Sequence, residues 1–254
     1  MKKFLLAVLL LISVSVKAQF KPFRFAFISD THIGSPSGGA EEDLLRTVRD
    51  INAQSNIDFV VITGDITELG TNKELKEAKR ILDSLHIKYY ILPGNHDTGW
   101  SESGGVMFTS VFGYDKFSFN FNGIQFIGCA SGPYVRMSDG HIPRDAVNWL
   151  DLELKKLPPN QPVVFLNHYP LDKDLDNWYE AVDRLKNHRT LAVLNGHWHT
   201  NRRMQYEDLP AVVGRSNLRA KAAYGGYNLV DVRLDSMIFA ERTPGIETKK
   251  AWTG

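Results

Sequence analysis

Five apolar runs in this chain are each followed closely by side chains that can bind metal ions. In chain order these side chains are Asp30 with His32, Asp65, Asn95 with His96 and Asp97, His168, and His197 with His199. The preceding apolar runs are typical of buried β-strands. Because open α/β sheets place their ligands at the carboxyl ends of strands, these side chains are expected to meet at one sheet edge. The pattern predicts a site for two metal ions.

Strands and helices alternate in the first half of the chain. Short runs of β-branched and aromatic residues predict strands, and apolar residues at a spacing of three to four predict helices. The predicted strands are 23–29, 58–63 and 88–92, and the predicted helices are 41–53 and 72–85. This alternation favours right-handed crossover units and a mainly parallel sheet.

The second half of the chain adds antiparallel elements. Asn122 and Gly123 separate two strand-like runs, which is the strongest short signal for a hairpin. A helix at 144–157 follows, and the further predicted strands are 163–167, 190–195, 211–213, 227–232 and 237–240. The polar end, 243–254, has no helix or strand pattern and is compatible with a linker. Together these elements predict an α/β fold, a four-layer α/β/β/α sandwich with the site along one sheet edge.

The first eighteen residues have the composition of a secretory signal peptide. Lys2 and Lys3 precede an apolar run, and Ala18 stands at the expected cleavage point. The run is shorter than the roughly 18 to 20 residues that span a bilayer, which argues against a stable membrane anchor. We therefore expect residues 1–18 to be removed, residues 19–254 to form one domain, and the mature protein to be periplasmic or secreted.

The formal net charge bears on the partners of the protein. Cleavage after Ala18 would remove three lysines and change this charge from +1 to −2. A chain without a basic excess has no global field that would attract nucleic acid, and no nucleic-acid partner is expected.

Oxygen and imidazole donors define the chemistry of the predicted site. Carboxylates, an amide oxygen and imidazoles suit ions such as Zn, Mn or Fe. Cys129 is the single cysteine, so a thiolate cluster and an internal disulfide are excluded, and its apolar surroundings predict a buried, inert thiol. Asp30 and His32 lie two residues apart, so an extended segment would direct both toward one ion. His197 and His199 share that spacing.

These residues resemble the pattern of the calcineurin-like metallophosphoesterase superfamily. The pattern is an Asp and a His two apart, a Gly-Asp pair, a Gly-Asn-His-Asp or Glu run, a lone His and a Gly-His-x-His run. Every part is present in this order between Asp30 and His199. The stretch 28–97 looks most like the bacterial cyclic-nucleotide-phosphodiesterase-like branch. The resemblance implies mixed sheets in the fold of that superfamily and two metal ions, divalent or of mixed valence.

The resemblance also implies a role for each residue. One ion would be bound by Asp30, His32, Asp65 and His199, and the other by Asp65, Asn95, His168 and His197. Asp65 would then bridge two ions about 3.5 to 4 Å apart, and a hydroxide between them would attack phosphorus. His96 would steady the phosphoryl oxygens and protonate the leaving alkoxide. Either Glu68 or Asp97 would orient His96, and Glu68 is the preferred candidate.

The implied reaction is hydrolysis of small-molecule phosphoesters, with diesters favoured. Glu68 occupies the third position after Asp65, where purple acid phosphatases carry an iron-binding Tyr, so that branch is disfavoured. A phosphomonoesterase with the same metals is one alternative. A non-catalytic phosphoester-binding scaffold is another, and the intact set of residues argues against it.

Overall fold

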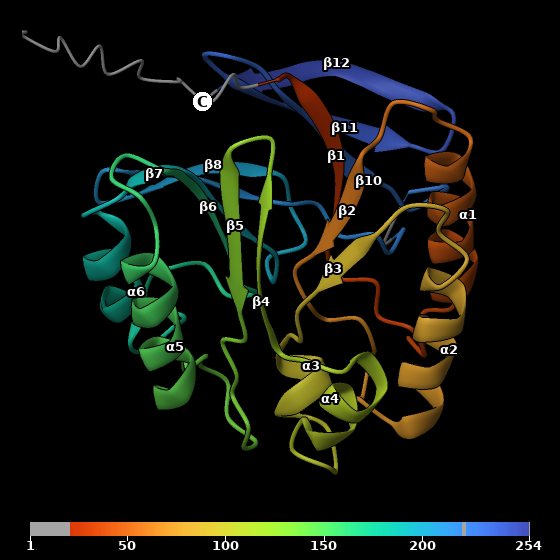
Figure 1. Ribbon diagram of the computed structural model, residues 1–254. Helices are drawn as coiled ribbons and strands as arrows, with labels where there is room; N and C mark the ends of the chain where they lie inside the picture. Colours follow the sequence, from red (N-terminus) through yellow and green to blue (C-terminus); the bar gives the residue numbers. More distant parts are fainter. Residues whose placement is uncertain (1–20, 220–221, 254) are drawn as a thin grey trace, which may run out of the picture.

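Two six-stranded sheets pack face to face, and helices cover the outer side of each (Figure 1). The structure is a computed structural model that describes residues 21–219 and 222–253. The strand order is β12-β11-β10-β1-β2-β3 in the first sheet and β4-β5-β6-β7-β9-β8 in the second.

The elements are defined by the following bounds. The strands are β1 (Phe23–Ile28), β2 (Phe59–Ile62), β3 (Tyr89–Ile91), β4 (Lys116–Phe121), β5 (Ile124–Cys129), β6 (Pro162–Leu166), β7 (Arg189–Asn195), β8 (Arg202–Tyr206), β9 (Leu209–Val213), β10 (Tyr227–Val232), β11 (Met237–Thr243) and β12 (Ile246–Thr253). The helices are α1 (Ala40–Asn52), α2 (Asn72–Leu82), α3 (Asn95–Thr98), α4 (Val106–Phe112), α5 (Arg144–Lys155) and α6 (Trp178–Leu185).

Alternate side chains of the central strands enter different cores, as the two-residue period of a strand requires. On β1, Phe25 and Phe27 pack between the sheets, whereas Ala26 and Ile28 pack with residues of α1 and α2. The second sheet is built in the same way, with α5 and α6 on its outer face. The resulting layers are helices, sheet, sheet and helices, so the predicted four-layer sandwich is confirmed (Figure 1).

Both sheets are mixed. Strands β1, β2 and β3 run parallel, and so do β5, β6, β7 and β9, while antiparallel strands flank each parallel set. The crossover helices α1 and α2 join the parallel strands of the first sheet. The carboxyl ends of the parallel strands are therefore the places where candidate site residues collect.

Most of the predicted elements are present within a few residues of their expected bounds. The hairpin turn has Asn122 at φ 45° and Gly123 at φ 85°, which are the two left-handed positions that this turn needs. Helices α3, α4 and α6 and strand β8 had not been predicted. They are short, and β8 carries two arginines and a glutamine in a half-exposed edge strand, so its apolar pattern is weak.

The prediction of an irregular segment from Thr243 onward is wrong. Residues Ile246–Thr253 form β12, an antiparallel edge strand paired with β11. The reason lies in Pro244 and Gly245, which form the turn between the two strands, with Gly245 at φ 81°. A Pro-Gly pair is a strong turn signal, and an edge strand can form from backbone pairing without a long apolar run.

The predicted signal peptide, residues 1–18, lies outside the described residues. Among the residues that are described, no helix combines the length and the apolar character needed to cross a membrane.

Candidate metal centre

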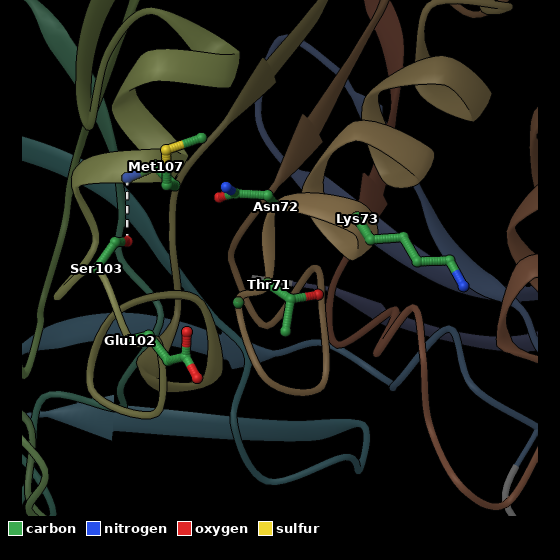
Figure 2. A pocket seen from close by; sticks show the side chains of 7 residues that line it. Thr71, Asn72, Lys73, Glu102, Ser103 and Met107 are labelled. Atoms are coloured by element: carbon green, nitrogen blue, oxygen red, sulfur yellow. Dashed lines mark hydrogen bonds between the residues drawn. The ribbon is translucent and has the colours of Figure 1, made fainter.

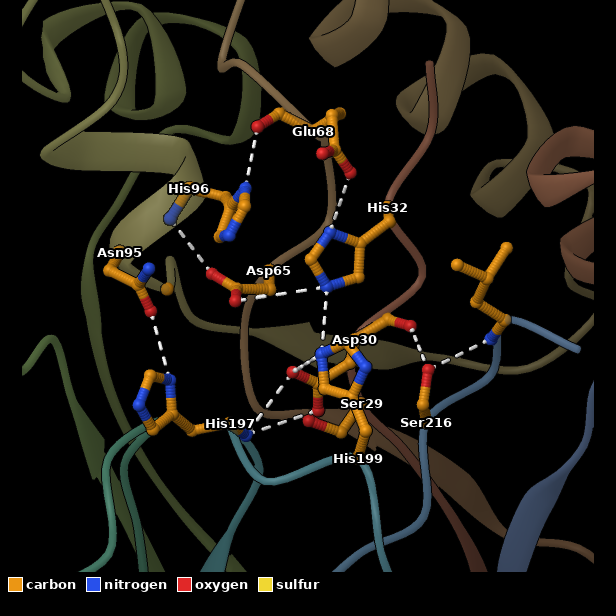
Figure 3. A network of polar contacts seen from close by, with 12 residues as sticks. Ser29, Asp30, His32, Asp65, Glu68, Asn95, His96, His197, His199 and Ser216 are labelled. Atoms are coloured by element: carbon orange, nitrogen blue, oxygen red, sulfur yellow. Dashed lines mark hydrogen bonds and ion pairs between the residues drawn. The ribbon is translucent and has the colours of Figure 1, made fainter. Parts of the chain in front are cut away.

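The candidate ligands come from the carboxyl ends of five strands in both sheets. Asp30 and His32 follow β1, Asp65 follows β2, and Asn95 follows β3. His168 follows β6, and the segment with His197 and His199 follows β7. The structure brings all seven predicted ligands together, as Figure 3 shows for six of them.

The backbone at these positions is held in an unusual conformation. Five of the candidate ligands have left-handed φ values without being glycine, namely Asp30 (53°), His32 (46°), Asp65 (49°), His197 (73°) and His199 (55°). Such residues cost on the order of 1 to 3 kcal/mol each and gather at functional sites. Backbone hydrogen bonds join the loop after β1 to the loop after β2. The amide of Asp30 donates to the carbonyl of Gly64, and the amide of His32 donates to the carbonyl of Asp65. This concentration of strain indicates a functional centre.

One cluster joins Asp30, His32, Asp65 and His199, with ligand atoms that all lie within 4.8 Å of one another. The Nε2 atoms of His32 and His199 are 3.0 Å apart. The Nε2 atom of His199 is also 3.3 Å from Oδ1 of Asp30. This set is the one that the resemblance implied for the first ion.

A second cluster joins Asp65, His168 and His197, again within 4.8 Å. The Nε2 atom of His168 lies 3.1 Å from Oδ2 of Asp65 and 3.1 Å from Oδ1 of Asn95. The Nδ1 atom of His197 is 3.1 Å from the same oxygen of Asn95. Because Asp65 belongs to both clusters, its carboxylate lies where a bridging ligand would have to be.

The spacing of these atoms fits ligands of common ions. Two donor atoms, nitrogen or oxygen, that are each about 2.1 Å from one ion and at a right angle to each other lie about 3.0 Å apart. The separations of 3.0 Å in the first cluster and 3.1 Å in the second match that value. The Nδ1–H of His168 donates to the carbonyl of Thr63 at 2.9 Å, which leaves Nε2 directed into the centre.

Two carboxylates are buried in this centre. Asp30 and Asp65 are fully or almost fully buried, and the ion pairs of both in the described chain involve histidines rather than Lys or Arg. Burial opposes ionisation of both, but the hydrogen bond of Asp30 to His199 and the charge of His168 beside Asp65 outweigh it, so the pKa of each carboxyl is lowered. Buried negative charges of this kind require nearby positive charge, which bound cations would supply.

The pKa values of His168 and His197 are shifted by burial and by the charges around them. Burial alone would lower the pKa of His168, but the charge of Asp65 reverses the effect and raises it to about 9. His197 is buried beside His168, and these two causes lower its pKa to about 4. The pKa of His168 is therefore governed by the charge of Asp65, whose Oδ2 lies 3.1 Å from its Nε2.

The close approach of two loops depends on small residues. A Cβ atom on Gly94 would collide with the backbone amide and carboxylate of Asp65. Gly64, at φ 111°, would place a side chain 2.7 Å from the backbone of Gly94. Gly64 and Gly94 therefore let the loops that follow β2 and β3 touch.

His96 lies at the edge of the centre. Its Nδ1–H donates to the backbone carbonyl of Glu68 at 2.6 Å, so Nε2 is the ring nitrogen that this hydrogen bond leaves unused (Figure 3). Its amide donates to Oδ1 of Asp65 at 2.9 Å, which ties its position to the shared carboxylate. The imidazole is 4.7 Å from that of His32, measured between ring centres.

The expected roles of Glu68 and Asp97 differ from what the structure shows. The carboxylate of Glu68 contacts Nδ1 of His32 at 3.0 Å, whereas the hydrogen bond between Glu68 and His96 is made by the backbone carbonyl of Glu68. The carboxylate of Asp97 accepts hydrogen bonds from the amides of Ile66, Thr67 and Gly94. Neither side chain orients His96, because each is already directed to another partner. The short-range sequence pattern could not distinguish side-chain from backbone contacts.

A separate cleft of about 410 Å³ lies at the start of α2 (Figure 2). It is lined by Gly70, Thr71, Asn72, Lys73, Glu102, Ser103 and Met107, none of which is a candidate ligand. The first turn of α2 is capped internally, since Glu74 and Thr71 bond each other's amides. The cleft is thus distinct from the metal centre.

The geometry of a shared carboxylate between two ligand clusters, at strand ends of a sandwich, defines a candidate two-metal hydrolase centre. A family model described as calcineurin-like phosphoesterase matches residues 23–201. The chain therefore belongs to the calcineurin-like phosphoesterase family, and it is a metal-dependent phosphoester hydrolase.

Two curated relatives cover most of the chain. A probable glycerophosphodiester phosphodiesterase of Arcobacter nitrofigilis is 30% identical over 200 residues, which are 68% of this chain and 70% of that protein. A 3′,5′-cyclic-nucleotide phosphodiesterase of Nostoc is 25% identical over 207 residues, 72% of this chain and 74% of that one. Among solved structures, a dimetal phosphatase from Danio rerio has the same fold, with a TM-score of 0.70, 15% identity, and coverage of 91% of this chain and 98% of that one.

Proposed function

We propose that this protein is an exported phosphodiesterase that works with two metal ions. The observation that carries the two-metal proposal is the position of Asp65. Its Oδ2 is 3.1 Å from Nε2 of His168 in one cluster and 3.9 Å from Nε2 of His32 in the other. One carboxylate shared by two ligand sets is what a binuclear centre requires.

Bound ions in such a centre lower the pKa of water and neutralise charge on a phosphoryl group. The chain itself supplies the arrangement around them. Asp30, His32 and His199 would hold one ion, Asn95, His168 and His197 the other, and Asp65 both. The metal identity is proposed as Zn, Mn or Fe, because the donors are oxygens and imidazole nitrogens.

His96 is proposed as the general acid. Its Nδ1 is occupied by the Glu68 carbonyl, so Nε2 is the atom that can give a proton to the leaving alkoxide. The hydrogen bond from its amide to Asp65 fixes the imidazole beside the shared carboxylate. The imidazole is therefore positioned to act on a substrate held at the centre.

Diesters are the proposed substrates. Support comes from the two curated relatives, which are named as phosphodiesterases, and from Glu68 at the position where purple acid phosphatases have Tyr. A phosphomonoesterase with the same centre is the alternative. Kinetics on bis(4-nitrophenyl) phosphate and 4-nitrophenyl phosphate separate the two, and a strong monoester preference contradicts the proposal.

Metal analysis of the full chain, purified without chelator, tests the two-ion proposal directly. We expect close to two equivalents of metal and a loss of activity on chelation that is restored by one of the proposed ions. A single equivalent at full activity contradicts it. Export is tested separately by fractionating cells that produce the full chain and sequencing the N-terminus, which is expected near Gln19.

A further inference from the structure

An exposed aromatic ring lies next to the proposed general acid. The indole ring of Trp100 is 6.1 Å from the imidazole of His96, measured between ring centres. Trp100 is 41% exposed and belongs to none of the three buried clusters among the described residues. Its ring therefore offers surface beside the site rather than packing in the core.

The loop that follows β5 lies against Trp100. The guanidinium carbon of Arg136 is 5.4 Å from the centre of the indole ring. The adjacent residue Val135 is 65% exposed, and a Cβ on Gly99 would lie 3.1 Å from the carbonyl oxygen of Val135. The segment before α4 and the loop after β5 thus meet at the ring, and they leave a cation and apolar groups exposed there.

We propose that Trp100 and Arg136 form the binding surface for the leaving group, and that they select phosphoesters whose ester group carries a planar, uncharged ring, such as a nucleoside. This inference rests on the proposed role of His96. The group that His96 protonates must depart beside its imidazole, and Trp100 is the exposed ring at that place.

The chemistry of the pair determines which leaving groups fit. Any nucleobase can stack on an indole ring, whichever polar groups the base carries, because every base has a π-face. Arg136 repels a cationic leaving group such as choline or ethanolamine, and it can donate hydrogen bonds to base or ribose oxygens. A small polar alcohol such as glycerol has no ring to stack on Trp100, so neither side chain adds much to its binding affinity.

The test compares two phosphodiesters, 3′,5′-cyclic AMP and glycerophosphoethanolamine, with the metal-loaded full chain. The variants are Trp100→Ala, Trp100→Phe and Arg136→Ala, and Tyr179→Ala on α6 is the matched control, since Tyr179 is also an exposed aromatic residue. We expect Trp100→Ala to raise KM for cyclic AMP about 10-fold, with a small change in kcat, because one base–aromatic stack is lost. Trp100→Phe should restore most of the affinity.

The ratio of kcat/KM for the two substrates is the decisive quantity. Trp100→Ala should reduce the preference for cyclic AMP about 10-fold, and Arg136→Ala should shift the ratio toward glycerophosphoethanolamine. An equal effect on both substrates, or no effect, overturns the inference. Metal content and melting temperature, measured on each variant, show whether a loss reflects damage to the centre instead.

A failure of the proposed diesterase function would give a different result from a failure of the inference on Trp100 and Arg136. If the wild-type chain hydrolyses neither diester but cleaves monoesters, the diester proposal is wrong. The same variants are then compared on AMP and phosphoethanolamine, and the selectivity ratio decides on Trp100 and Arg136 as before.

Discussion

The side-chain carboxylate of Glu68 lies 3.0 Å from Nδ1 of His32, while the backbone carbonyl of the same residue receives the Nδ1–H of His96 at 2.6 Å. One residue thus sets the orientation of a candidate metal ligand and of the proposed general acid. Carboxylates that support a ligating histidine in this way strengthen metal binding. The two contacts can be separated by mutation, because only one of them depends on the side chain.

Glu68→Ala should weaken metal binding about 10- to 100-fold, as the loss of an outer partner of a ligating histidine usually does. Glu68→Gln keeps an oxygen acceptor and should have a smaller effect. Metal titration with a competing chelator measures this change directly. Glu77→Ala is the control, since Glu77 pairs with Arg80 on the exposed side of α2. Unchanged affinity in Glu68→Ala would contradict the supporting role.

Asp65→Asn should reduce metal occupancy at both positions and abolish turnover, because its carboxylate belongs to both clusters. His199→Ala should reduce occupancy mainly at one position, since His199 belongs to one cluster. Elemental analysis after exhaustive dialysis distinguishes these outcomes. If Asp65→Asn keeps both ions, the bridging assignment is incorrect.

His96→Ala should retain its metal and lose about 10²- to 10⁴-fold in kcat, the usual contribution of a general acid. The effect should be smaller for a substrate whose leaving group is 4-nitrophenolate, which needs little protonation. His141→Ala is the control, because His141 pairs with Asp176 outside the two clusters. Full activity of His96→Ala would refute the assigned role.

The free energy of unfolding should depend on pH through Asp50. Burial opposes ionisation of this carboxyl, but Arg242, Tyr227 and the amide of Gly245 donate hydrogen bonds to it and lower its pKa. Because the pKa is lower in the folded protein, this stabilisation is full above about pH 4, the ordinary pKa of Asp. It disappears as the pH falls through the folded-state pKa.

Asp50→Asn should therefore cost about 2 kcal/mol at pH 7, the value typical of hydrogen bonds to a charged group. The difference from the wild type should shrink toward pH 3. Urea unfolding of chelator-treated protein at both pH values measures this. A difference that is constant with pH would show that ionisation of Asp50 does not matter.

Cys129 should be unreactive in the folded protein. Burial raises the pKa of its thiol to about 12, so almost no thiolate exists at pH 8. Iodoacetamide should label the chain only after unfolding, and mass spectrometry gives the extent. Rapid labelling of the native protein would mean that the loop after β5 opens readily.

The sequence alone predicted the site better than the details around it. Asp30, Asp65 and His168 each follow a strongly apolar run, and the position of a strand end in a sheet follows from the order of the elements. The contacts of Glu68 were not predictable, because its side chain and its carbonyl point to different histidines. Strand β12 was missed because it forms by backbone pairing at an edge.

The candidate ligands are divided between the sheets: Asp30, His32, Asp65 and Asn95 follow strands of the first, while His168, His197 and His199 follow strands of the second. Each cluster takes members from both sheets. Cations held there would link the two halves of the sandwich through ligands from both sheets. The melting temperature of this enzyme should consequently rise with its metal content. Removal of the metal should lower the stability of the whole domain as well as abolish activity.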